Sequence, residues 1–157
     1  MMIFSQIENI KNGERITLRI HYGFLNAGYA TLTANQVNYR NAPHYRVTGV
    51  GKSTGAVRAF FKVDDVYESY INIATGLPSH YVRNVSEGGY KRHFETDFNH
   101  DNQTLVLTNK LDKTSKNFKT VKGIQDMISA FYYLRSMDAS NFKVGSSLKI
   151  NIWIDDE

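Results

Sequence analysis

Hydrophobic and polar residues alternate along most of the chain, with the period of two that is typical of half-buried β-strands. In residues 15–22 the apolar Ile16, Leu18 and Ile20 alternate with arginine, threonine and histidine. Similar alternation predicts further strands over residues 28–34, 45–50, 57–63, 66–74, 80–85, 90–98, 105–107 and 148–154. Turn-forming residues at Asn41-Ala42-Pro43 and Glu87-Gly88-Gly89 separate some of them, and residues 110–116 are expected to form a polar loop.

One stretch changes to the period of an α-helix. Its apolar residues follow a spacing of three and four and so share one face: Ile124, Met127, Ile128, Phe131 and Leu134. Asp126 in the first turn and Arg135 in the last turn suit the helix dipole. The pattern predicts one helix near residues 124–137.

These elements together predict a mainly β fold. We expect an antiparallel meander of about eight or nine strands, curled into a barrel or a sandwich, with the helix packed on an open side. The 157 residues suit a single β-rich domain, 1–157. The apolar stretch 148–154 is expected to pair inside this sheet or to form an exposed edge strand.

Composition narrows the chemistry without identifying a reaction. The absence of cysteine excludes disulfides, thiolate zinc sites and a cysteine nucleophile. No stretch approaches the ~18 apolar residues of a membrane-spanning helix, and no secretory leader is visible at the start. Ten tyrosines could line the mouth of a barrel and bind a hydrophobic or glycan ligand, or could simply pack across strands.

The net charge of +4 is distributed unevenly. Residues 1–63 contain eight Lys or Arg and two acids. This excess suits an anionic partner or a solubilising surface. The basic residues are scattered singly and no basic-aromatic signature accompanies them, so we expect no nucleic-acid partner.

One strand face offers candidate catalytic chemistry. His93, Glu95 and Asp97 lie two residues apart and therefore share a face, where they could hold a divalent metal or act as acid and base. The same residues are also what the solvated face of a strand requires, and that interpretation is favoured. We expect no cofactor and no resident metal.

Three further motifs are weaker. Asp64-Asp65 and Asp155-Asp156-Glu157 are interpreted as a turn and as a turn or solvated terminus, respectively, rather than as cation sites. The segment 49–53 resembles a phosphate-binding loop only superficially, because that motif requires glycine where Arg46 stands.

Several motifs, in order, resemble a known bacterial family. They are residues 22–28, 61–71, 83–91 (Arg-Asn-Val-Ser-Glu-Gly-Gly-Tyr-Lys), 126–135 and 155–157. On these residues the chain resembles the domain-of-unknown-function 3108 family, over nearly its whole length.

The resemblance implies a mostly β protein, exported to the bacterial cell envelope or periplasm and frequent in Bacteroidetes, without an established activity. It also implies that the chain is an N-terminal portion of a longer domain. The family provides no catalytic residues. Its recurrent Arg83, Glu87 and Tyr90 are our candidate ligand-binding residues, although Gly-Gly is also a turn device and Arg83 with Glu87 an expected ion pair.

Our leading hypothesis is therefore a non-enzymatic envelope domain that binds a hydrophobic or glycan ligand, such as a lipid, or a partner protein. One alternative is a metal-assisted hydrolase that uses His93, Glu95 and Asp97. Another is an assembly module that oligomerises through an exposed edge strand.

Overall fold

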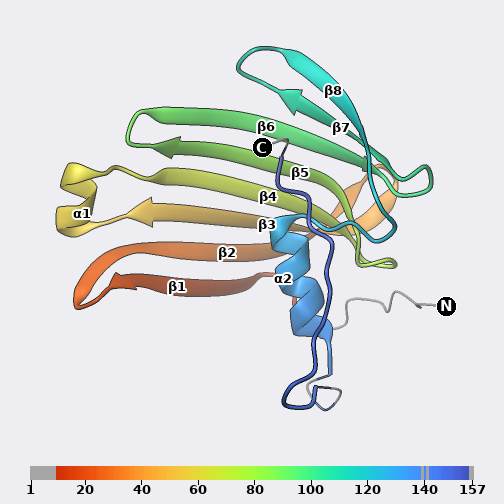
Figure 1. Cartoon of the computed structure of the whole chain (residues 1–157), viewed down its shortest axis with the longest axis horizontal. Helices are drawn as coiled ribbons and strands as arrows, with labels where there is room; N and C mark the ends of the chain where they lie inside the picture. The colour runs from red at the N-terminus through yellow and green to blue at the C-terminus, as the bar shows by residue number, and fades with distance from the viewer. Residues whose placement is uncertain (1–9, 139, 141, 156–157) are drawn as a thin grey trace.

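A single curved antiparallel sheet dominates the computed structural model, which describes residues 10–138, 140 and 142–155. Its eight strands follow one another in sequence order, each paired with the next, so the sheet is a meander (Figure 1). They are β1 (Glu14–Tyr22), β2 (Leu25–Tyr39), β3 (Ala42–Ser53), β4 (Asp64–Asn72), β5 (Pro78–Glu87), β6 (Tyr90–Asn99), β7 (Thr104–Asn109) and β8 (Thr114–Lys119). The predicted mainly β class is confirmed, and the sheet is not closed.

Tight turns connect several neighbouring strands. Arg40 and Asn41 both have positive φ between β2 and β3, and so do Gly88 and Gly89 between β5 and β6. Two consecutive residues of this kind form a type I′ turn, whose twist matches that of the flanking strands. The predicted turn at Glu87-Gly88-Gly89 is confirmed, and the turn at residues 41–43 lies one residue earlier than predicted.

The core lies on the inner, concave face of the sheet. Ala34, Val47, Ile71 and other inward-pointing strand residues are buried there. The helix α2 (Met127–Ser136) covers this face with Ile128 and Tyr132 (Figure 1). It is the helix that the apolar spacing predicts, and it is shorter than predicted at its beginning.

Two local predictions are wrong. Residues 57–63 were expected as a strand, but Gly55–Phe60 forms the short helix α1, and only Val63 makes an isolated β-bridge, to Glu87. Arg58 in α1 donates to both carboxylate oxygens of Asp64 at 3.0 Å and to the Val63 carbonyl oxygen at 3.1 Å, which holds this connection compact. The expected loop 110–116 instead contains the start of β8, which pairs with β7.

The stretch 148–154 is not a strand of the sheet. It runs beside α2 across the concave side (Figure 1), where the backbone of Trp153 donates to the Gln125 carbonyl oxygen at 2.8 Å. The Trp153 ring packs against Phe118 of β8, with 5.0 Å between the ring centroids. The predicted strand is therefore wrong: the segment covers the sheet face instead of joining the sheet, and Ile152 makes only an isolated β-bridge, to Gln125.

β1 and β8 are the outermost strands of the sheet, so each is paired on one side only among the described residues. No helix in the described part of the chain is long and apolar enough to cross a bilayer.

Candidate functional site

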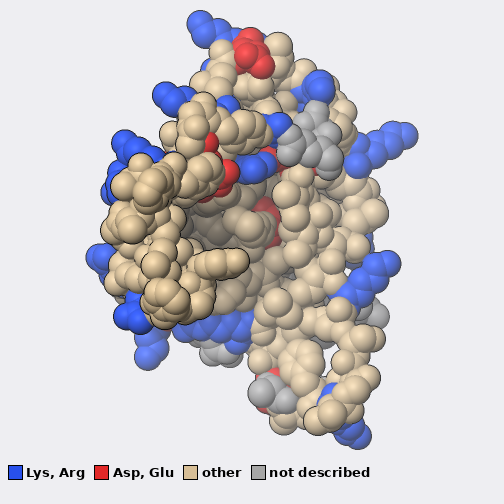
Figure 2. Space-filling model, turned by 60° about the vertical axis from the view of Figure 1, so that its left-hand side comes forward, with Lys and Arg blue, Asp and Glu red and all other residues tan. Residues whose placement is uncertain are grey.

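The concave face is hollowed at the end of the sheet that carries α1 and the β1–β2 turn (Figure 2). We call this space the hollow. One wall is apolar, because Leu18 and Ile20 of β1 point inward, on the same face as Leu32, which packs against the core. Leu18 is 48% and Ile20 50% exposed, so neither side chain is covered as a core residue would be. This wall offers apolar surface to a molecule within the hollow.

Glycines keep the middle of this face bare. Gly51 of β3 lies between Ala30 on β2 and Asp65 on β4. A Cβ atom built on Gly51 would find its nearest neighbour only at 3.8 Å, so the space above it is open. At the adjacent Gly49 the same atom would lie 3.0 Å from Leu32 and 3.6 Å from Ile128, so there the glycine makes room for α2.

The opposite wall is polar. Asp65, Tyr67, Arg83 and Glu87 point inward from β4 and β5, and Asp155 joins them from the C-terminal segment; we call these five residues the polar cluster. Arg83 forms an ion pair with Asp155, whose side chain is almost completely buried, and hydrogen-bonds Tyr67. Figure 2 shows acidic atoms on the wall of the hollow, while lysines and arginines project from the outer surface.

Two carboxyl groups of the polar cluster, those of Asp65 and Glu87, lie close together. Burial raises the pKa of Glu87, and its hydrogen bond with the nearby Asp65 raises it further. Asp65 is held in place by the Ser86 backbone, which donates to its Oδ1 at 2.9 Å. Together the two carboxyl groups present oxygen acceptors to a bound hydroxyl.

A pocket of about 440 Å³ continues the concave face along β6, β7 and β8. It is lined by Phe94, Leu107 and Leu111 together with polar and basic side chains. Phe94 lies directly opposite Arg83 in the β5–β6 register, so the pocket borders the polar cluster. Its size is within the range of small-molecule sites.

A separate polar group is completely buried beneath the polar cluster, where α2 meets the sheet. Asp126 accepts from Ser69 Oγ of β4 at 2.6 Å and from the Ser129 backbone at 2.7 Å. Burial raises the pKa of Asp126 to about 6 in spite of these hydrogen bonds. We interpret this group as structural, since it caps α2 and ties the helix to β4.

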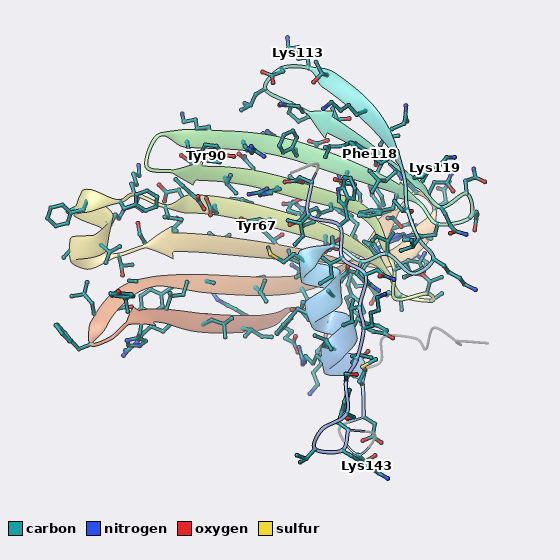
Figure 3. The ribbon with its side chains drawn as sticks, in the orientation of Figure 1. Tyr67, Tyr90, Lys113, Phe118, Lys119 and Lys143 are labelled. Carbon is teal, nitrogen blue, oxygen red and sulfur yellow. The ribbon has the colours of Figure 1, made fainter. Side chains whose placement is uncertain are left out.

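The sequence-predicted ligand residues fall in this region. Arg83 and Glu87 point into the hollow, and Tyr90 lies at its rim, directly opposite Glu87 (Figure 3). Arg83 pairs with Asp155 instead of forming the expected ion pair with Glu87, which hydrogen-bonds Asp65. Both acidic partners were assigned to turns or to the chain end, and both are in fact buried. Period-two alternation places Asp65 on the same face as the core residues Ser69 and Ile71, a signal that the turn interpretation overlooked.

The other acidic motifs behave differently. Asp64 lies at the start of β4 and pairs with Arg58 and Lys62. Asp155 has a positive φ of 52°, as expected for a turn, but it is not solvated. Asp156 and Glu157 lie outside the described residues.

His93, Glu95 and Asp97 share the outer face of β6, as the spacing predicts. His80 of β5 contacts two of them on this face. Its Nδ1 lies 2.8 Å from Asp97 Oδ1, and its Nε2 lies 4.0 Å from Glu95 Oε2. The hydrogen bond from His80 and the ion pair with Arg40 lower the pKa of Asp97, against the opposite effect of burial. In the described part of the chain, no three His, Asp or Glu side chains converge so that they could hold a metal ion.

Comparison with curated proteins and with solved structures found no match. A family model described as "Protein of unknown function (DUF3108)" matches residues 17–157, which include β2 to β8, both helices and the whole polar cluster. The chain therefore belongs to this family, as the sequence motifs predict.

Proposed function

We propose that this protein is a non-enzymatic binding domain of the bacterial cell envelope, and that the hollow binds an amphipathic molecule. One observation carries the proposal: half-exposed Leu18 and Ile20 face the polar cluster across the bare surface at Gly51. A ligand with an apolar chain and a polar head would satisfy both walls at once.

Each wall supports a different part of such a ligand. Covering Leu18 and Ile20 removes apolar surface from water, which is favourable by about 25 cal/mol for each Å². The carboxyl groups of Asp65 and Glu87 can accept hydrogen bonds from hydroxyl groups, and Tyr67 adds an aromatic surface next to them. Hydroxyl groups, as in a glycan, suit this pair better than a phosphate, which would meet carboxylates.

The test is isothermal titration calorimetry with dodecyl maltoside, which joins an apolar chain to an uncharged sugar head, used below its micelle concentration. We expect saturable binding to the wild type. Gly51→Leu should fill the bare surface and weaken binding about ten-fold or more, because a side chain would take the ligand's place. Thr48→Leu is the matched control, since Thr48 lies on the outer face of the same strand.

A second variant guards against misfolding of the first. Ile20→Gln changes a half-exposed side chain on the rim of the apolar wall and should weaken binding with little effect on the fold. The proposal would be refuted if the wild type showed no saturable binding. It would also be refuted if Gly51→Leu and Ile20→Gln both bound the detergent as tightly as the wild type does.

The envelope location rests on the resemblance to exported proteins. Fractionation of cells that express the native gene with a C-terminal tag tests it, and recovery of the protein in the cytosol alone would contradict this part.

A further inference from the structure

Exposed apolar side chains gather on the loops at one end of the sheet. These loops join β1 to β2, β3 to β4, β5 to β6 and β7 to β8; they comprise residues 23–24, 54–63, 88–89 and 110–113, and we call them the mouth loops. Because the sheet is a meander, all four lie at the same end, around the opening of the hollow (Figure 1). Phe24 is 99% and Phe60 92% exposed, and Phe61 and Leu111 are exposed as well.

The loops at the other end of the sheet provide an internal comparison. They comprise residues 40–41, 73–77 and 100–103 and, like the mouth loops, join consecutive strands of the sheet. None of these residues is an exposed large hydrophobic one. Apart from Gly76 and Leu77, which are buried, these loops are at least partly exposed to solvent, as the mouth loops are. A general tolerance for exposed hydrophobic residues on the surface would therefore not favour one end over the other. The difference indicates that the mouth loops contact something apolar.

Nothing in the local fold requires an aromatic ring at the first mouth loop. Gly23 has φ of 59° and provides the backbone conformation of the tight turn, with Phe24 beside it at the tip. The Phe24 ring touches almost nothing, and a polar residue would form this turn equally well. At Phe60 the situation is similar, since α1 has no buried residue.

The charges between these rings are mainly positive. The mouth loops contain four basic residues, Arg58, Lys62, Lys110 and Lys113, and one acid, Asp112. Arg58 and Lys62 also pair with Asp64 at the start of β4, and Lys110 pairs with Glu95 of β6. Lys113 lies at the tip of the β7–β8 loop (Figure 3). The mouth loops thus contain more basic than acidic residues, although the wall of the hollow behind them is acidic.

We propose that the mouth loops dock onto an anionic lipid bilayer, with Phe24 and Phe60 in the interfacial layer and the basic residues against the head groups. Aromatic rings with adjacent Lys or Arg are typical of membrane interfaces. The core of a protein–protein interface is instead depleted of lysine and forms one contiguous patch. Here the rings lie on separate loops with basic residues between them, which favours a bilayer over a protein partner.

Docked in this way, the opening of the hollow faces the bilayer. An amphipathic molecule could then pass between membrane and hollow without crossing water. The docking itself does not depend on that exchange, because the mouth loops and the walls of the hollow are different residues.

The test is co-sedimentation of the full chain with vesicles, without added ligand. We expect binding to vesicles of phosphatidylcholine and phosphatidylglycerol in equal parts, weakening as salt rises, and much weaker binding to phosphatidylcholine alone. Phe24→Ser combined with Phe60→Ser should lower the partition coefficient about ten-fold or more. Phe142→Ser is the matched control, since Phe142 is exposed but lies outside the mouth loops.

Two measurements separate the possible failures. Lys110→Glu combined with Lys113→Glu should reduce binding to the anionic vesicles only. Gly51→Leu should leave vesicle binding unchanged, so failure of ligand binding and failure of docking remain distinguishable. The proposal is overturned if the wild type does not bind anionic vesicles or if the double serine variant binds equally well. Light scattering that shows a wild-type dimer converted to a monomer by those substitutions, without vesicle binding, would assign the rim to a second copy.

Discussion

At the scale of single residues, several side chains are buried or exposed contrary to the usual preference of their residue type. Asp65, Asp126 and Asp155 are buried on the concave side, whereas Phe24 and Phe60 stand in solvent. The buried acids are each held by hydrogen bonds or by an ion pair, which offsets the cost of removing a carboxylate from water. No contact within the fold covers the exposed rings of Phe24 and Phe60, and we therefore infer that they contact another molecule.

The raised pKa of Asp126 predicts that the free energy of unfolding depends on pH. Its pKa is raised from 3.8 to about 6 in the folded protein, so the folded state binds this proton more tightly than the unfolded chain does. The stabilisation from the proton is therefore complete below about pH 4 and is lost as pH rises through about 6. Compared with Asp126→Asn, the wild type should lose roughly 3 kcal/mol at most in free energy of unfolding between pH 4 and pH 7.

Urea unfolding of both proteins at several pH values measures this difference. Asparagine is a suitable control because it also caps helices and does not titrate. A pH-independent difference between the two would contradict the buried, proton-binding Asp126.

At the scale of elements, the two helices owe their positions to different contacts. α2 begins with a capping box, in which Ser129 Oγ accepts from the Asp126 backbone at 2.9 Å while the Asp126 carboxylate accepts from the Ser129 backbone. Its last turn is tied to β1 by the ion pair of Arg135 with Glu14. α1 has no buried residue and no side-chain cap, and it is held mainly by Arg58.

Because the capping box stabilises the start of α2, removing one of its hydrogen bonds should lower the free energy of unfolding. Ser129→Ala removes the reciprocal hydrogen bond and leaves the Asp126 backbone amide buried without a partner. We expect the free energy of unfolding to fall by about 1–2 kcal/mol. Ser136→Ala is the control at the other end of the helix, where Ser136 Oγ donates to the Tyr133 carbonyl oxygen on the helix itself. Thermal unfolding followed by circular dichroism compares them, and an equal loss for both would contradict the role of the box.

At the scale of the whole molecule, one continuous sheet carries α2 and the C-terminal segment on its concave side. α2 and the C-terminal segment cross that face and contact strands far apart in the sequence: Asp155 pairs with Arg83 of β5, and Trp153 packs on Phe118 of β8. The result is a basic outer surface around a partly acidic interior (Figure 2).

This arrangement predicts a single cooperative unfolding transition. Trp153 is the only tryptophan, so its fluorescence reports the C-terminal segment, whereas far-ultraviolet circular dichroism reports the sheet. Because the segment is anchored to β5 and β8, both signals should change at the same urea concentration. An earlier change in fluorescence would show that the segment separates from the sheet first.

The sequence predicted the strands and α2 well, and the errors have identifiable causes. Alternation depends only on which face of a strand is buried, so it identified β1, β4 and β6. It failed at residues 57–63, because a six-residue helix without a buried face has no periodicity of its own. It failed at β8, most of whose residues are exposed, so no apolar alternation marks the strand.

The sequence by itself determined the class of fold, the family and the turn chemistry, since these follow from local alternation, glycine positions and ordered motifs. Only the tertiary structure decided that the apolar stretch 148–154 covers the sheet instead of extending it, and that Asp65 and Asp155 meet Arg83 and Glu87. It also decided that the exposed rings of distant loops gather at one rim. These are contacts between residues far apart in the chain, and they depend on the curvature of the sheet, which no local pattern specifies.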